Sequence, residues 1–177
     1  VAIFTNLSGD HLDYHHDMEH YYQAKRRLFT EQLSSKGAAV INVNDPYGAR
    51  LAEELSGDVK LITFGGPDSD AKWHITNVEL SADGVKFRLE GRSSAFDVAS
   101  NLIGEHNICN LAGAILAVRE FGLKPDEIDR ALAVPIQVPG RLERIDSQMG
   151  FPVYVDYAHT DDALSRVLEI LRRITAR

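Results

Sequence analysis

The sequence predicts an α/β fold in which a mostly parallel sheet with helices is joined to a small antiparallel sheet. Residues 38–43 form a nearly continuous apolar run, which is typical of a parallel strand buried on both faces. A turn ending in Pro46, a short helix and a strand over residues 60–64 follow, so this region predicts a βαβ unit. From Trp73 the apolar period changes to two, and Asp83-Gly84 separates two alternating runs, which indicates a hairpin.

The N-terminal part predicts a short strand over residues 1–5, a loop over 6–17 and an amphipathic helix over 18–33. Asp17 is the expected N-cap of this helix. Its predicted apolar face combines residues at helical spacing, namely Met18, Tyr21, Tyr22, Leu28, Phe29 and Leu33.

Lys25 falls near the middle of that apolar face, and two interpretations follow. The side chain can pack its stem and extend its ammonium group to water. Alternatively, desolvation favours the neutral amine, which can act as a base or be modified covalently. Carbamylation by carbon dioxide would turn this lysine into an anionic oxygen ligand suited to magnesium.

The run Asp10-His11-Leu12-Asp13-Tyr14-His15-His16 just before the helix has the residue types of a metal site. A metal-dependent hydrolase built on Asp10, His11, Asp13 and His15 is therefore one candidate function. The alternative is a solvated loop in which Asp13 caps a turn.

The second half predicts three further helices and a boundary. A helix over residues 104–121 carries Asn107 and Asn110 in its first turn, where Asn107 would cap the helix and Asn110 would be solvated. A short helix over 126–133 precedes a segment at 135–143 with two prolines and a glycine, which is typical of a boundary between domains.

A buried strand over 152–160 ends in polar groups and leads to a helix over 161–173. This helix is expected to turn four apolar residues inward, namely Leu164, Val167, Leu168 and Leu171. Ligands of open α/β sheets bind at the carboxyl ends of strands, so Asp156 and His159 are well placed for a site, and on pattern alone a capping role for Asp156 is an equal alternative.

Composition excludes several classes of protein. The net charge of −7 argues against a nucleic-acid partner. Cys109 is the single cysteine, so the sequence has no internal disulfide and fits a reducing compartment. No apolar run reaches the length of a membrane span, no signal peptide is seen, and the opening VAIF suggests a fragment of a longer protein.

The stretch TNLSGDHLDYHHDMEHYYQAKRRLF resembles the signature of the Mur ligase family, and departs from it at Gly9 and His16. Weaker matches are the H-N-x-x-N pattern at 106–110 and GRLE at 140–143, while VDYAHT at 155–160 is a strong one. By this resemblance His11 is a magnesium ligand and Lys25 is a carbamylated lysine that helps hold a second magnesium ion. Asn107 and Asn110 are expected at the adenine of ATP, Arg141 at its phosphates, Asp156 at its ribose and His159 nearby.

The resemblance further implies two domains. Residues 1–143 would be the later part of the central ATP-binding domain, and residues 144–177 the first strand and helix of a Rossmann-like C-terminal domain. The family phosphate loop, the UDP-binding domain and most of the amino-acid pocket lie outside the sequence.

The implied function is a ligase that uses ATP and Mg²⁺ to add a third amino acid, meso-diaminopimelate or lysine, to UDP-N-acetylmuramoyl-L-alanyl-D-glutamate. The implied route passes through an acyl phosphate, and the fragment is expected to be inactive alone. A cytoplasmic monomer with small-molecule substrates and no membrane partner is expected. A sister ligase, such as a folylpolyglutamate synthetase or another Mur ligase, remains an alternative, as does an inert structural or interaction fragment.

Overall fold

The computed structural model describes residues 1–8, 15–57, 59–145, 147 and 150–175. Within them, six strands form one sheet in the order β1-β2-β3-β4-β5-β6, and two more pair separately as β7-β8. The six strands are β1 (Ala2–Phe4), β2 (Ala38–Asn42), β3 (Lys60–Gly65), β4 (Trp73–Ser81), β5 (Gly84–Gly91) and β6 (Ala95–Ser100). The pairs from β1 to β4 are parallel and those from β4 to β6 are antiparallel, which confirms the predicted α/β fold class.

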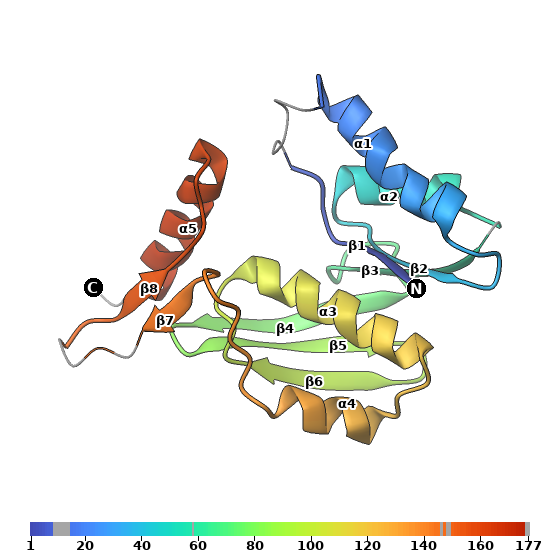
Figure 1. Cartoon of the computed structure of the whole chain (residues 1–177). Helices are drawn as coiled ribbons and strands as arrows, with labels where there is room; N and C mark the ends of the chain where they lie inside the picture. The colour runs from blue at the N-terminus through green and yellow to red at the C-terminus, as the bar shows by residue number, and fades with distance from the viewer. Residues whose placement is uncertain (9–14, 58, 146, 148–149, 176–177) are drawn as a thin grey trace.

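Helices cover the sheet on two sides (Figure 1). One side carries α1 (Met18–Arg27) and α2 (Pro46–Glu54), which pack on β1 and β2 through a cluster that includes Phe4, Tyr22 and Leu51. The other side carries α3 (Glu105–Glu120) and α4 (Pro125–Leu132). The side chains of successive β2 residues therefore pack into the two cores on opposite faces of the sheet, which explains why all five residues are buried.

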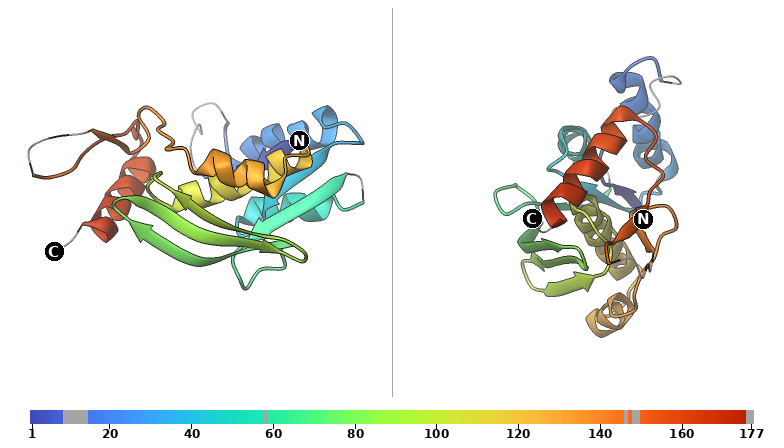
Figure 2. Two further views of the ribbon diagram at one scale, coloured as in Figure 1. Left: turned by 90° about the horizontal axis from the view of Figure 1, so that it is seen from below. Right: turned by 90° about the vertical axis from the view of Figure 1, so that its left-hand side faces the viewer.

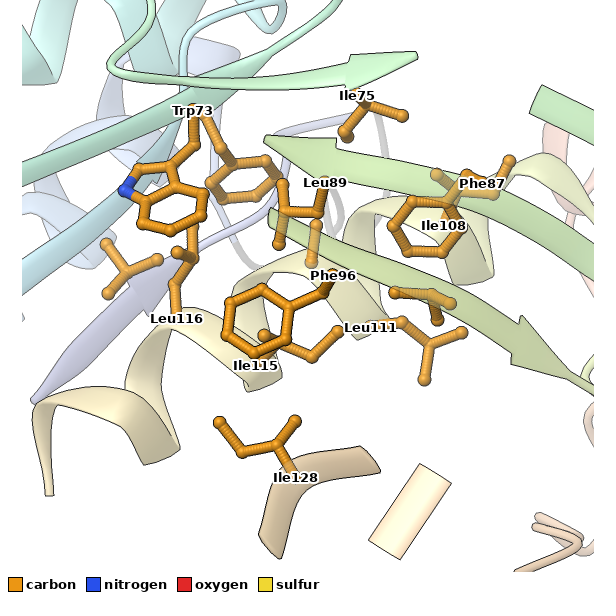
Figure 3. Close-up of a cluster of buried hydrophobic side chains, with 14 of the residues drawn as sticks. Trp73, Ile75, Phe87, Leu89, Phe96, Ile108, Leu111, Ile115, Leu116 and Ile128 are labelled. Atoms are coloured by element: carbon orange, nitrogen blue, oxygen red, sulfur yellow. The ribbon is translucent and has the colours of Figure 1, made fainter. Parts of the chain in front are cut away.

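The larger core lies between α3, α4 and the antiparallel strands (Figure 3). Trp73 and Phe96 face each other across β4–β6 with ring centroids 6.1 Å apart. Ile115 and Leu116 of α3 and Ile128 of α4 close the cluster, and all three are at most 2% exposed.

The two N-terminal helices begin as the sequence predicts. The carboxylate of Asp17 accepts a hydrogen bond from the His20 amide at 2.8 Å, so Asp17 caps α1. Asp45 caps α2 ahead of Pro46, and its second oxygen accepts a bond from the Leu7 amide at 3.0 Å. Asp45 therefore also fixes the chain just before residues 9–14.

The predicted helix over 18–33 changes type along its length. After α1, residues Leu28–Gln32 form a π-helical turn, η1. Because a π-turn holds more residues than an α-turn, it shifts the phase of the apolar face. Phe29 is consequently buried, whereas Leu28 is 48% exposed, and its predicted place on the apolar face is wrong.

The C-terminal segment is less buried than the sequence predicts. The strand expected over 152–160 is reduced to β8 (Val153–Val155), which pairs antiparallel with β7 (Glu143–Ile145) and is only partly buried. The helix is present as α5 (Asp161–Ile174), but Leu164 and Leu168 on its expected inner face are 50% and 57% exposed. An amphipathic pattern predicts an apolar face, but it does not predict which part of a protein covers that face.

Figures 1 and 2 show α5 toward one end of the sheet and α1 with α2 toward the other. No helix in the described ranges has the length and apolar character needed to cross a membrane.

Candidate functional site

A pocket of about 510 Å³ lies where three separate segments meet, and it is the candidate ligand site. Its walls come from the carboxyl end of β1, the first turn of α3, and the segment from 138 through α5. The carboxyl end of a parallel strand next to a helix N-terminus is where α/β proteins bind ligands. The lining residues include Thr5, Asn6, Ser8, His106, Asn107, Asn110, Arg141, Asp156, Thr160 and Arg166.

Two amide side chains stand in the first turn of α3. Gly104, with φ at 101°, takes the N-cap position, so the expectation that Asn107 caps the helix is wrong. Asn107 instead is 8% exposed and donates to the carbonyl oxygen of Ile103 at 2.9 Å. Asn110 donates to the side-chain oxygen of Asn107 at 3.2 Å, which leaves its own carbonyl oxygen and one N–H for a ligand.

Arg141 reaches the pocket from a tight turn. Gly140 and Leu142 on either side of it both have positive φ, 69° and 44°. The Arg141 amide donates to the carbonyl oxygen of Val138 at 3.1 Å, and the Tyr157 amide donates to that of Gly140 at 2.8 Å. The backbone at Gly140 and Arg141 is therefore held by hydrogen bonds, while the Arg141 side chain is exposed.

Asp156 joins this turn to the strand that follows it. One carboxylate oxygen accepts a hydrogen bond from the Leu142 amide and the other accepts one from the Ala158 amide, both at 2.8 Å. Each oxygen keeps further acceptor capacity. Asp156 thus lines the pocket while it also holds the backbone of two segments.

His106 and Arg166 line the same pocket, although the sequence analysis did not select them as site residues. Desolvation lowers the pKa of His106; the charge of Asp156 opposes this shift, and the charges of Arg141 and Arg166 add to it. Because His106 directly precedes Asn107, its place in the helical turn is a signal that could have identified it. Thr5 was similarly recognisable as the residue that ends the first predicted strand.

Four of the predicted nucleotide residues, Asn107, Asn110, Arg141 and Asp156, therefore meet in one pocket. His159 is not among the lining residues. Its ring is exposed, its Nδ1 lies 3.0 Å from the carbonyl oxygen of Tyr157, and it stands edge-on to the Tyr157 ring at 5.1 Å.

Lys25 lies elsewhere, on α1. It is half-buried, and its Nζ stands 4.9 Å above the centre of the Tyr21 ring. Tyr21 in turn stacks on His15 at 4.7 Å. Within the described part of the chain no carboxylate forms an ion pair with Lys25.

The predicted metal ligand His11 lies outside the described residues, as do Asp10 and Asp13. Elsewhere in the chain, the described residues contain no group of three His, Cys, Asp or Glu side chains placed to hold a metal ion. The shared metal role of His11 and Lys25 therefore stays a prediction.

A mixed sheet flanked by helices, with a polar pocket at the end of a parallel strand, defines the class of α/β ligand-binding domains. The Mur ligase middle domain profile matches residues 1–118, so the chain belongs to the Mur ligase family.

Relatives with curated names are similar over nearly the whole chain. The UDP-N-acetylmuramoyl-L-alanyl-D-glutamate–2,6-diaminopimelate ligase of Geobacter metallireducens is 44% identical, over 98% of this chain and 34% of its own length. The ligase of the same name from Streptomyces coelicolor is 41% identical, over 99% of this chain and 34% of its own. The chain thus spans about a third of the relatives that it matches.

Solved structures agree with the fold. A structure of a UDP-N-acetylmuramoyl-L-alanyl-D-glutamate–2,6-diaminopimelate ligase has a TM-score of 0.81 and 34% identity, over 99% of this chain and 36% of that one. A complex of FPGS with AMPPCP has a TM-score of 0.79 over 99% of this chain and 43% of that one, and at 20% identity it supports the fold alone.

Proposed function

We propose that this chain is part of an ATP-dependent ligase that adds 2,6-diaminopimelate to UDP-N-acetylmuramoyl-L-alanyl-D-glutamate. The observation that carries the nucleotide part of this proposal is the pocket that collects Asn107, Asn110, Arg141 and Asp156 from segments far apart in the sequence. The names of the relatives, at 40–44% identity, support the reaction and favour diaminopimelate over lysine.

The residues of the pocket fit the parts of ATP. The amides of Asn107 and Asn110 offer the paired donor and acceptor that the adenine edge requires. Arg141 matches phosphate oxygens with its planar guanidinium, and Asp156 can accept hydrogen bonds from ribose hydroxyls. His159, which is exposed beyond the lining, is assigned to the rim near the nucleotide.

Lys25 and His11 are the proposed metal residues. Lys25 is half-buried on α1, and carbamylation by carbon dioxide would turn its amine into an anionic oxygen ligand suited to Mg²⁺. His11 would hold one Mg²⁺, and carbamylated Lys25 would help hold another. Bound Mg²⁺ would neutralise negative charge on the phosphates during transfer.

The proposed reaction has two steps. The carboxylate of the muramoyl dipeptide attacks the γ-phosphate of ATP and gives an acyl phosphate with release of ADP. The amine of diaminopimelate then displaces phosphate and forms the amide. In this scheme the full protein is a cytoplasmic monomer that acts on small molecules. The net charge of −7 over the 177 residues argues against a nucleic-acid partner for this part of it.

Full-length protein tests the proposal. We expect phosphate release that depends on ATP, Mg²⁺, the UDP-muramoyl dipeptide and diaminopimelate together, with lysine a poorer substrate. Lys25→Ala should lower kcat about 100-fold or more, since it removes the proposed metal ligand. A carbonyl resonance of the lysine carbamate, seen by NMR in ¹³C-bicarbonate and absent from Lys25→Ala, would identify the modification directly.

Lys25→Arg serves as the matched variant, because it keeps the positive charge but cannot form the lysine carbamate. It should be as inactive as Lys25→Ala. Full activity of either variant would contradict the role of Lys25. Hydrolysis of ATP, or of an ester substrate, without amide formation would contradict the ligase. The 177-residue chain alone should form no amide.

A further inference from the structure

Glu143 holds the turn from which Arg141 enters the pocket. One oxygen of its carboxylate accepts a hydrogen bond from the Gly140 amide at 2.9 Å. The other accepts a bond from the side-chain amide of Gln137 at 3.3 Å. Glu143 itself lines a neighbouring pocket with Arg141, and is not among the residues of the pocket described above.

The backbone of this turn requires support. Leu142 has φ at 44°, in the left-handed region that a leucine rarely adopts, yet it is 4% exposed. Such a conformation persists only where surrounding contacts impose it. Two carboxylates supply those contacts here: Glu143 binds the Gly140 amide before Arg141, and Asp156 binds the Leu142 amide after it.

We propose that Glu143 is a positioning residue for nucleotide binding, which acts through Arg141 by fixing the turn on which that arginine stands. This inference rests on the proposed function, since it assumes that Arg141 contacts the phosphates of ATP. Its physical basis is that a charge-assisted hydrogen bond to a backbone amide is strong and directional. The turn is therefore already ordered in the folded protein, so ordering it does not weaken nucleotide binding.

The inference predicts that Glu143 matters only while Arg141 is present. In full-length protein with Mg²⁺, Arg141→Ala should weaken binding of AMPPCP about tenfold, the loss expected for a charged hydrogen bond. Glu143→Ala should weaken it about fivefold by letting the turn move. The double variant should bind like Arg141→Ala alone, because two residues that act as one unit are not additive.

Two further variants separate positioning from general stability. Glu143→Gln keeps an oxygen for the Gly140 amide, so it should restore most of the affinity lost in Glu143→Ala. Glu127→Ala is the matched control: Glu127 also accepts a bond from the backbone amide three residues earlier, at 2.8 Å, but at the start of α4. It should lower the melting temperature about as much as Glu143→Ala and leave AMPPCP affinity unchanged.

Calorimetric titration of AMPPCP into the wild-type protein and these variants distinguishes a failure of the proposed function from a failure of this inference. If the wild-type protein does not bind AMPPCP, the proposed function fails and this inference fails with it. If the wild-type protein binds and Arg141→Ala weakens binding, the nucleotide site stands. Under that result, a Glu143→Ala protein with normal affinity, or effects of Glu143→Ala and Arg141→Ala that simply add, would overturn the inference while the proposed function survives.

Discussion

At the scale of single residues, His106 shows how the groups around the pocket shift the pKa of a side chain. Desolvation lowers its pKa, Asp156 raises it, and Arg141 and Arg166 lower it further. A histidine whose pKa falls on folding binds fewer protons in the native state than in the unfolded state. Its contribution to stability is therefore present above the unfolded value of about 6.5 and is lost as the pH falls below it.

A titration of the His106 ring by NMR should consequently have its midpoint below about 6.5. Arg141→Gln should raise that midpoint, because it removes a positive charge that opposes protonation. Arg172→Gln, which changes an exposed residue in the last turn of α5, is the control and should leave it unchanged. An unshifted midpoint in Arg141→Gln would show that the two side chains do not interact.

At the scale of helices, a network of charged side chains joins α1 to α2. Glu54 on α2 accepts hydrogen bonds from Arg26 and Arg50. Arg50 also binds Glu19 on α1 through both carboxylate oxygens, at 2.7 and 3.0 Å. These bonds, together with one from Gln23, lower the pKa of Glu19 to about 2. The Arg50 guanidinium lies 4.3 Å over the ring of Tyr22, which is fully buried.

This network fixes the helix that carries Lys25, so Glu54→Gln should loosen it. We expect a loss of about 1 kcal/mol in the free energy of unfolding, since the residues are partly exposed but share one network. Glu31→Gln breaks an ion pair with Arg27 that lies within the same helical segment, and it should cost less than about 0.5 kcal/mol. Urea denaturation compares the two variants, and equal costs would argue against a special role for the contact between helices.

The sequence predicts these elements well where the signal is local. Pro46 at the start of α2 and the Asp83-Gly84 hairpin correspond to observed structure, whereas the alternation from Trp73 holds only to Thr76, after which the register of β4 shifts and Val78 is 46% exposed. The π-turn after Arg27 and the left-handed φ of Leu142 have no local signature in the sequence, and the Leu142 turn is supported by a hydrogen bond from its amide to the distant Asp156. Periodicity likewise cannot predict that Asn107 and Arg141 line one pocket, and only the family resemblance assigned them to one ligand.

At the scale of the whole molecule, the helices of the described chain differ in how deeply they are buried. α3 contributes eight buried residues to the core, whereas α5 has none among its described side chains. The contacts of α5 with the rest of the chain include Ile170 near Gly104 and the ion pair of Arg173 with Glu105. Helices with little buried apolar surface open at low free-energy cost.

Hydrogen exchange of the 177-residue chain should therefore be uneven. Backbone amides of α5 should exchange at least about ten times faster than those of α3, because local opening of α5 breaks few packed contacts. Mass spectrometry of peptides from the two helices measures this directly, with α4 as an intermediate reference. Equal protection of α3 and α5 would mean that α5 opens only when the whole chain unfolds.

The strand order of the sheet also affects how the chain can fold while it is being synthesised. Its strands lie side by side in the same order as they occur along the polypeptide. Within the set β1 to β6, each strand can therefore join the edge left by the one before it, and none has to be inserted between two of these strands that have already paired. The chain can add its strands one at a time during translation.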